Sequence, residues 1–471
     1  MASDSEKSLR HAALLIAVIS AFMIPFVSNA VMISLPTIGR EFHSDTILLA
    51  WVRTAYLITA AVFLMPFGRI ADIMGRKKIM RIGIAIYTLA STLCAVSSSV
   101  EMLIGARALQ GFGASMVFGT AVAIVTSVYP ADMRGKALGI RSAFVFLGIS
   151  CGPSIGGFIS QYFGWRSIFF INMGLGLIIL ALMTWRLPGE WAGAKGEKFD
   201  TRGAFVCSAS LLLAIYGILN LVRSWGPLLL LAGLGGLIVF GWLEARTPSP
   251  LFDISLFTRN RVFLFSNLTA LIIYIAIAAR TFMLSFYLQE IRGLDQLWAG
   301  LVMLAQPAVQ VVLSPVAGWL SDKKFEPRHI ASLGMAFVTV ALVLLAMLDS
   351  ATPISYVAVS LALLGCGIAM FSSPNTNAIM GSVSNRSYSI ASATQSTVII
   401  LGMNLSMGIV MLLLTVHVGE VQLSPEHHAG FMTALRISFG MFAGLCAIGI
   451  ATSLARGKSR KSAADLAPTR D

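Results

Sequence analysis

The chain has 471 residues, of which 57% are hydrophobic and 12% are charged, and its mean hydropathy is +0.82. Soluble proteins are about 45–50% apolar and about 25% charged, so this composition excludes an ordinary water-soluble fold and places the excess apolar side chains against lipid. The net charge of +13 does not indicate nucleic-acid binding, because the basic residues fall in short groups between long apolar runs and form no single basic face.

Apolar runs long enough to cross a bilayer, for which about 20 residues are needed, occur fourteen times. The first run is not a cleavable signal peptide, because it has 24 residues and ends in Leu-Pro-Thr rather than in a small-residue cleavage site. The sequence therefore predicts an all-α, polytopic membrane protein. The predicted spans are 12–35, 46–67, 79–99, 102–128, 138–161, 167–186, 203–222, 224–243, 262–288, 296–320, 329–348, 353–381, 388–416 and 431–454.

The distribution of Lys and Arg predicts the orientation, because cytoplasmic loops carry the excess of positive charge. With the N-terminus inside, the inner loops and tails hold 26 of the 34 Lys and Arg residues. The outer side holds six, among them Arg53, and Arg107 and Arg280 remain within spans. We therefore expect a multi-pass protein of the cell membrane (the inner or plasma membrane) with both termini in the cytoplasm.

Two short elements recur at nearly the same spacing, which indicates an internal repeat. The element Pro66–Asp72 at the end of span two returns as Pro315–Asp322 at the end of span ten, with Gly68 and Gly318 250 residues apart. Gly111–Met116 returns as Gly365–Met370, 254 residues on. The predicted organisation is a cytoplasmic N-tail (1–11), a six-helix bundle (12–186), a linker with two additional transmembrane helices (187–261), a second six-helix bundle (262–454) and a basic cytoplasmic C-tail (455–471).

The turn between spans two and three, Gly68 to Lys78, carries the most specific motif. Its glycines permit a tight turn and close helix approach, and Asp72 can pair with Arg76 or sit near a helix N-terminus, so that the turn can latch the two halves in one state. This turn resembles the signature loop of the major facilitator superfamily, Gly-x-x-x-Asp-x-x-Gly-Arg-x-x. The resemblance implies a conformational switch formed by Gly68, Asp72, Gly75, Arg76 and Lys77.

Two further motifs resemble those of the fourteen-span multidrug-efflux (drug:proton antiporter) branch of that superfamily. Arg107-Ala108-Leu109-Gln110-Gly111 is similar to its span-four motif, which implies a proton-coupling role for Arg107, Gln110 and Gly111. In span five, Gly148, Gly152 and Gly156 repeat every four residues on one helix face, a pattern that lets helix backbones touch, and Pro153 can bend the helix. The resemblance makes this stretch a hinge that rocks without leaking, formed by Gly148, Gly152, Pro153, Gly156 and Gly157.

The sequence departs from that branch in the charges that lie within the membrane. Members usually carry an acidic residue in span one, at a position that falls on or near Val27, and the run 12–35 holds no carboxylate. All 21 Asp and Glu residues lie in loops, tails or span ends, whereas Arg107 and Arg280 lie within spans. Charges in spans are costly and usually face a cavity or a partner, although snorkelling or capping of backbone carbonyls would also explain both arginines.

Several uncharged polar residues within spans are candidates for a substrate cavity, together with Arg280. Gln306 and Gln310 share a helix face beside Pro307, and Ser373-Pro374-Asn375 predicts a broken stretch of helix. Such side chains can equally join helices by hydrogen bonds, worth about 0.6 kcal/mol each. The candidates are Asn29, Tyr56, Arg280, Gln306, Gln310, Asn375, Asn377 and Gln395.

These patterns favour a secondary active transporter that exports small apolar or amphipathic compounds by proton antiport with alternating access. The alternative is a uniporter or symporter of a small metabolite, with anionic metabolites included. A non-transporting receptor would need neither the repeat nor the hinge glycines. An enzyme is not indicated, since the chain has no Gly-x-x-x-x-Gly-Lys loop and no metal-spaced His or Cys cluster. We expect a monomer in the lipid bilayer, with a small-molecule substrate and protons as partners, and with no metal, cofactor or nucleic acid.

Overall fold

The computed structural model describes residues 4–247, 257, 260–323, 326–383 and 388–457. All regular secondary structure in this part of the chain is helical, and fourteen of its segments are long and apolar enough to cross a membrane. The predicted all-α, fourteen-span architecture is therefore confirmed. The basic C-tail beyond residue 457 lies outside the described residues.

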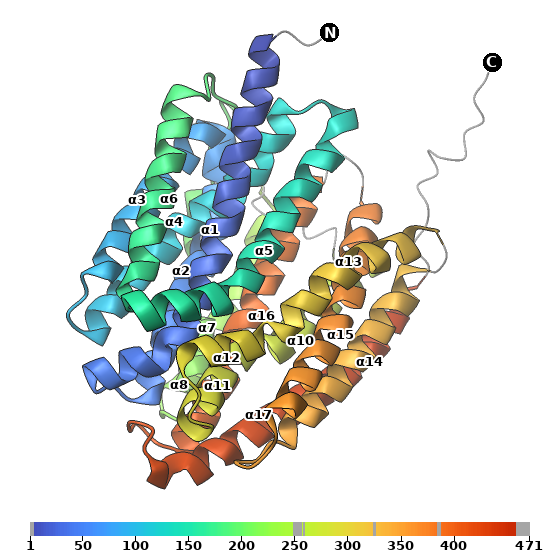
Figure 1. The fold of residues 1–471 in the computed structure, drawn as a ribbon. Coiled ribbons are helices and arrows are strands. Elements are labelled where there is room, and N and C mark those ends of the chain that lie inside the picture. Colours follow the sequence, from blue (N-terminus) through green and yellow to red (C-terminus); the bar gives the residue numbers. More distant parts are fainter. Residues whose placement is uncertain (1–3, 248–256, 258–259, 324–325, 384–387, 458–471) are drawn as a thin grey trace. The chain divides into compact units, whose positions relative to one another are not determined.

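The chain forms two compact units (Figure 1). Unit 1 comprises residues 1–251, 279–304 and 407–435, and unit 2 comprises residues 252–278, 305–406 and 436–471. These units assign parts of the later spans to the earlier unit, whereas the sequence repeat divides the chain into consecutive bundles. The predicted domain boundaries stay a prediction.

Unit 1 contains the helices of the first eight spans, in which α1 packs along α5, α2 and α3 pack against α4, and α7 packs against α8. It also contains three shorter segments from the later part of the chain, α11, η1 and α12, and the 3-10 turn η3. The bounds are α1 Asp4–Phe42, α2 Thr46–Met74, α3 Arg76–Ala95, α4 Val100–Val128, α5 Ala131–Phe163, α6 Arg166–Trp185, α7 Thr201–Leu219, α8 Gly226–Glu244, α11 Arg280–Phe286, η1 Tyr287–Ile291, α12 Gln296–Met303 and η3 Pro425–His427.

Unit 2 is built around α15, which packs against α14, α13 and α10. Two further helices, α16 and α17, belong to unit 2 for residues 388–406 and 436–455 and to unit 1 for the rest of their length. The bounds are α10 Arg261–Ile277, α13 Ala305–Lys323, α14 Pro327–Ala346, α15 Ile354–Gly381, α16 Tyr388–His417 and α17 His428–Ala455.

Three span boundaries differ from those that the sequence predicts. Helix α1 extends well beyond 12–35 and passes through Pro25 and Pro36, since proline is tolerated in membrane helices where other groups satisfy the freed backbone. The predicted break at Ser373-Pro374-Asn375 is wrong, because α15 runs uninterrupted through Pro374. Span ten is instead interrupted at Leu304, where the nearby Pro307 cannot donate to the carbonyl of Met303.

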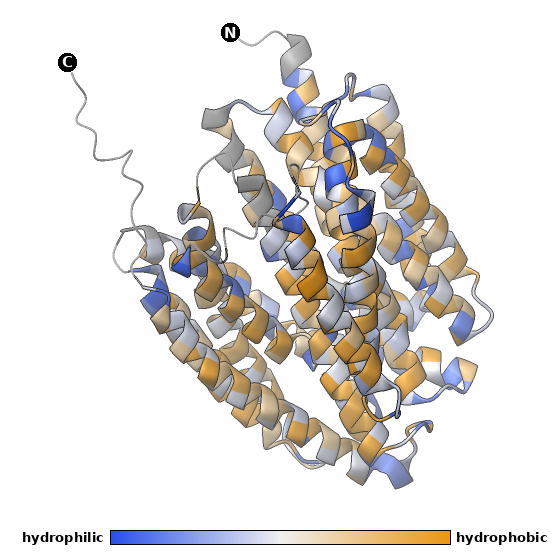
Figure 2. Ribbon diagram, turned by 180° about the vertical axis from the view of Figure 1, so that it is seen from behind, coloured by the Kyte–Doolittle hydropathy of each residue, from blue (hydrophilic) through white to orange (hydrophobic). Residues whose placement is uncertain are grey.

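The lipid-facing surface is recognisable from exposed apolar side chains on the helices. Phe205, Leu228, Leu231 and Ile238 are each more than two-thirds exposed, the last at 75%. Figure 2 shows hydrophobic residues along the middle of the helices and hydrophilic residues gathered at their ends and in the loops. A water-soluble protein rarely exposes apolar surface of this extent, so these faces require a bilayer.

The internal repeat appears in the structure as matching close contacts at glycines, one set in each unit. In unit 1 a side chain on Gly111 would strike the carbonyl oxygen of Tyr56, and in unit 2 one on Gly365 would strike that of Gln306. The carbonyl of Gly83 lies against Gly113 just as that of Gly334 lies against Gly367. Likewise Gly148 faces the carbonyl of Phe22, and Gly402 faces that of Leu271. The repeated sequence elements therefore make matching contacts at Gly111, Gly113, Gly365 and Gly367, and a further matching pair occurs at Gly148 and Gly402, which lie outside those elements.

Candidate functional site

The signature loop is the sharp link between α2 and α3, and a single residue, Gly75, makes the turn. Its φ of +117° lies in the region that favours glycine, and its N–H donates to the carbonyl of Ala71 at 2.9 Å. Gly68, by contrast, has open space around its Cα on the side where a side chain would project. The conformational requirement for glycine in this motif therefore falls on Gly75.

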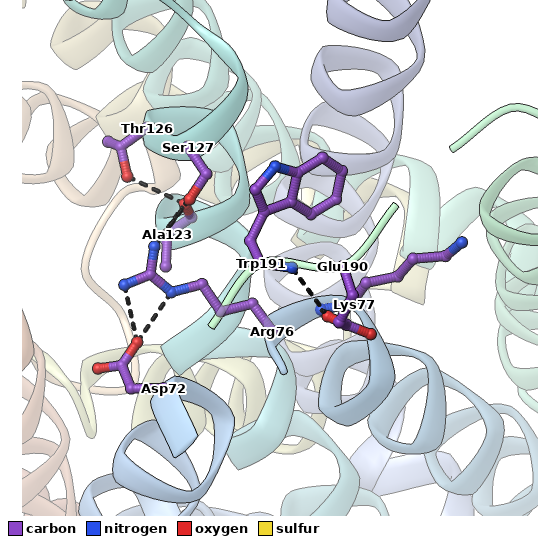
Figure 3. Close-up of polar contacts among 8 residues, drawn as sticks. All are labelled: Asp72, Arg76, Lys77, Ala123, Thr126, Ser127, Glu190 and Trp191. Carbon is purple, nitrogen blue, oxygen red and sulfur yellow. Dashed lines mark hydrogen bonds and ion pairs between the residues drawn. The ribbon is translucent and has the colours of Figure 1, made fainter. Parts of the chain in front are cut away.

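Arg76, the first residue of α3, joins three helices at this turn (Figure 3). Its Nε and Nη2 donate to Oδ1 of Asp72 at 2.8 and 2.7 Å, and its Nη1 donates to Oγ of Ser127 in α4 at 2.7 Å. The guanidinium thus satisfies a carboxylate of α2 and a hydroxyl of α4 at once. The predicted pairing of Asp72 with Arg76 is confirmed, and Ser127 is a partner that the motif does not reveal.

A segment between α6 and α7, Leu187–Glu197, docks on this loop and is called the strap below. Its backbone pairs with the loop twice, since Arg76 N–H donates to Trp191 O at 2.8 Å and Ala194 N–H donates to Asp72 O at 2.9 Å. Arg69 also pairs with Glu197 of the strap at 2.5 Å. Nothing in the sequence motif indicates that residues more than a hundred positions later bind the loop.

Glu190 of the strap caps the first turn of α3. Gly75 precedes this helix and has no side chain to cap it, so the first N–H groups need other acceptors. The two carboxylate oxygens of Glu190 accept from the N–H groups of Lys77 and Lys78 at 2.8 and 3.0 Å, and the Nζ of Lys77 donates to the carbonyl of Leu187. An anionic group at a helix N-terminus also interacts favourably with the helix dipole.

The span-four motif forms a buried polar chain inside unit 1. Arg107 is fully buried; its Nε donates to Val52 O of α2 at 3.2 Å, its Nη1 donates to Oε1 of Gln110, and its guanidinium lies 4.4 Å from the ring centre of Tyr56. Gln110 in turn donates to Ser91 Oγ at 2.8 Å, which also accepts from Asn172 at 2.6 Å. Arg107, Gln110 and Tyr56 are thus brought together, and Ser91 and Asn172 were missed because isolated polar residues in apolar helices carry no spacing signal.

Two further arginines of unit 1 lie within spans. The placement of Arg53 on the outer side is wrong, because it lies seven residues inside α2 and is 6% exposed, with its Nη1 3.5 Å from the Sδ of Met32. Arg280 begins α11, after the interruption of span nine at Ala278–Ala279, and its Nη2 donates to Thr281 Oγ1 at 3.1 Å. Arg53 is therefore covered by protein, whereas its position near a span end indicated an arginine on the outer side.

The glycines of the span-five motif form a seam between α5 and α1. A side-chain carbon on Gly152 would lie 2.6 Å from Asn29 Cβ, and one on Gly156 would lie 2.5 Å from Ala30 Cβ. Gly157 faces the carbonyl of Gln296, at the start of α12, in the same way. The predicted close packing is confirmed, whereas the hinge function of Gly148, Pro153 and their neighbours stays a prediction.

The remaining cavity candidates that the structure describes are held by protein partners or lie exposed. Asn29 donates to Pro25 O at 2.9 Å, and Gln306 donates to Gln310 at 2.6 Å. Asn375 binds the buried Arg456 at 3.0 Å and Ser266 O at 3.2 Å. Gln395 donates to Thr376 at 2.9 Å, and Asn377 is exposed. Their roles in a cavity stay predictions.

A sequence model described as Major Facilitator Superfamily matches residues 17–407. The chain belongs to this superfamily. It is 31% identical over 443 residues to the riboflavin transporter RibZ of Clostridioides difficile (strain 630), covering 93% of this chain and 95% of that protein. It is 29% identical over 381 residues to the multidrug resistance protein Stp of Mycobacterium tuberculosis (strain CDC 1551 / Oshkosh), covering 80% and 70%.

The solved structures agree with the fold. A bacterial homologue of the human lysosomal transporter Spinster, in an inward-facing and unoccupied conformation, matches with a TM-score of 0.70 at 16% identity over 97% of this chain and 98% of that one. This superfamily chain is therefore a membrane transporter with a major-facilitator-type fold, and it is not an enzyme. In the described residues, no three His, Cys, Asp or Glu side chains gather where they could hold a metal ion.

Proposed function

We propose that this chain exports small apolar or amphipathic organic compounds across the cell membrane by proton antiport with alternating access. In this proposal the protein works as a monomer, both termini and the strap lie in the cytoplasm, and the signature loop switches the accessibility of the substrate site. The relatives named as a riboflavin transporter and as a multidrug resistance protein support a small organic substrate.

The observation that carries this proposal is the three-helix junction at Arg76. Because one guanidinium binds both Asp72 of α2 and Ser127 of α4, and the strap binds both the end of α2 and the start of α3, these helices are tied into one body at this end. Alternating access in such transporters is largely the rocking of rigid bundles around a fixed site. The polar chain from Arg107 to Asn172 supports the coupling role that the family resemblance gives to Arg107.

The test is transport into inside-out vesicles with an imposed pH gradient, using cationic, neutral and anionic dyes. We expect uptake of at least one dye that is driven by the gradient and abolished by a protonophore. Arg107→Gln is expected to lose this drive, whereas the control Arg223→Gln, at an exposed pair with Glu420, retains it. Transport that is indifferent to the pH gradient would rule out the antiport mechanism.

A second candidate function is uniport or symport of a small anionic metabolite. It is favoured by one observation: in the described residues, no ion pair joins a carboxylate to Arg53, Arg107 or Arg280. Downhill movement of an anionic dye with no response to the pH gradient would favour this candidate over proton antiport.

A further inference from the structure

The three intramembrane arginines of unit 1 lie at similar depths. Arg53 is seven residues from the start of α2, Arg107 is seven from the start of α4, and Arg280 is eleven from the end of η1. At about 1.5 Å per residue these positions lie about 10–16 Å from the helix ends opposite the signature loop. Arg107 donates to the carbonyl of Val52, the residue before Arg53, and Arg53 meets Met32 of α1, the helix against which α11 with Arg280 packs. The three arginines therefore lie around one positive region of unit 1.

Hydrogen-bond donors of this region are left over after its protein contacts are made. Arg53 contacts only a thioether through its Nη1, and its buried Nε has no partner among the described residues. The Nη2 of Arg107 and the Nε of Arg280 are likewise buried and have no hydrogen-bond partner among the described residues. A buried, unpaired donor of a charged group is costly. An anionic acceptor in this region could satisfy these three donors.

Comparison of the two halves of the internal repeat shows whether the packing of the helices requires these charges. The paired glycine contacts align α2 with the start of span ten, α4 with α15, and α1 with α10 and α11. In that alignment the counterpart of Arg53 is Met303 and that of Arg107 is Leu361, both buried. The counterpart of Arg280 is Val31 in α1, also buried. Since the same packing is made with apolar residues at all three positions, the arginines are not required for helix packing.

Part of the polar chain that continues from Arg107 is likewise apolar in the other half of the repeat. Gln110 and Ser91 of unit 1 correspond to Leu364 and Leu342 of unit 2, which are both fully buried, whereas Tyr56 corresponds to the polar Gln306. At the positions of Arg107, Gln110 and Ser91, one half of the repeat is therefore apolar where the other half holds a positively charged, hydrogen-bonded chain. This asymmetry separates the network from the shared architecture.

We propose that Arg53, Arg107 and Arg280 bind the anionic group of an organic substrate, a carboxylate or a sulfonate, at this depth in unit 1. The inference rests on the proposed transport function and narrows its substrate class to organic anions. Guanidinium groups suit such a ligand, because their donors match a carboxylate or sulfonate in charge and geometry. The ring of Tyr56 beneath Arg107 holds that guanidinium in place.

The test is equilibrium binding to the purified full-length chain in detergent, with two xanthene dyes of similar size and opposite charge, fluorescein and rhodamine 123. We expect saturable fluorescein binding and at least about tenfold weaker rhodamine 123 binding. Arg53→Met, which installs the residue of the second half, is expected to weaken fluorescein binding by about tenfold or more, since a charge-assisted hydrogen bond is lost. Arg53→Lys is expected to recover part of the affinity.

Thermal unfolding without ligand separates a binding role from a structural one. Arg53→Met is expected to unfold at a higher temperature than the parent chain, because it replaces a buried unpaired charge with an apolar side chain. The exposed Arg223→Gln is expected to change neither binding nor unfolding. Fluorescein affinity that Arg53→Met leaves unchanged, or rhodamine 123 binding as tight as fluorescein, would overturn the inference. Gradient-driven transport of the cationic dye with no fluorescein binding would leave the proposed export intact and reject only the anion site.

Discussion

We predict that the substitution Glu190→Ala in the strap destabilises the first turn of α3. The side chain of Glu190 is exposed, but both its carboxylate oxygens accept from backbone N–H groups, those of Lys77 and Lys78. Loss of an N-cap side chain costs about 0.5–2 kcal/mol, and solvent replaces part of what an exposed carboxylate provides, so we expect about 1 kcal/mol. That corresponds to about fivefold faster opening of this turn.

Hydrogen exchange followed by mass spectrometry, on a peptide that contains Lys77 and Lys78, measures this opening. The matched control is Glu197→Ala, which removes the ion pair of the same strap with Arg69 and leaves the two capped N–H groups in place. We expect faster exchange in Glu190→Ala and parent-like exchange in Glu197→Ala. Unchanged exchange in Glu190→Ala would refute the capping role, and equal acceleration in both variants would show that the strap acts only by docking.

Two further predictions concern the interior of unit 1. Gly156→Val would push a side chain into Ala30 and is expected to lower the free energy of unfolding by about 1–3 kcal/mol. The control Gly105→Val, where a side chain meets open space, is expected to change it little. Equal thermal unfolding of the two variants would contradict the close α1–α5 seam. Gln110→Leu leaves Arg107 and Ser91 without their shared partner and is expected to cost about 3 kcal/mol. Gln395→Leu, which removes one partly buried bond to Thr376, should cost less in the same thermal unfolding measurement, and the reverse order would be inconsistent with the buried chain.

The sequence predicts the span count and the repeat well, because both depend on the order and spacing of residues along the chain. A run of about 20 apolar residues identifies a span whatever it packs against, and glycines at helix crossings keep their spacing when a bundle is repeated. The signature loop was predictable for a similar reason, since Gly75, Asp72 and Arg76 are neighbours in sequence and interact locally.

The features that sequence reasoning missed depend on which face of a helix a residue occupies, or on contacts with residues far away in the sequence. Arg53 lies near a span end, where hydropathy indicates an exposed arginine, and only the packing of α1 against it shows that it is buried. Proline at Pro374 predicts a break, yet α15 passes through it. The strap residue Glu190 meets the loop through tertiary contacts alone, so no local pattern could reveal it.

The strap also links the two extra helices to the signature loop. It is the covalent connection into α7, whose first residues follow Glu197 closely, beginning with the cap Asp200. Helix α7 is anchored to α2 through Ser208, which donates to Val62 O at 3.0 Å. Because the strap also binds Asp72, Arg76 and the first N–H groups of α3, any displacement of α7 relative to α2 would have to be absorbed in the few residues between Glu197 and Asp200. The additional pair of spans is thus fastened to the signature loop at two places, through the strap and through α2.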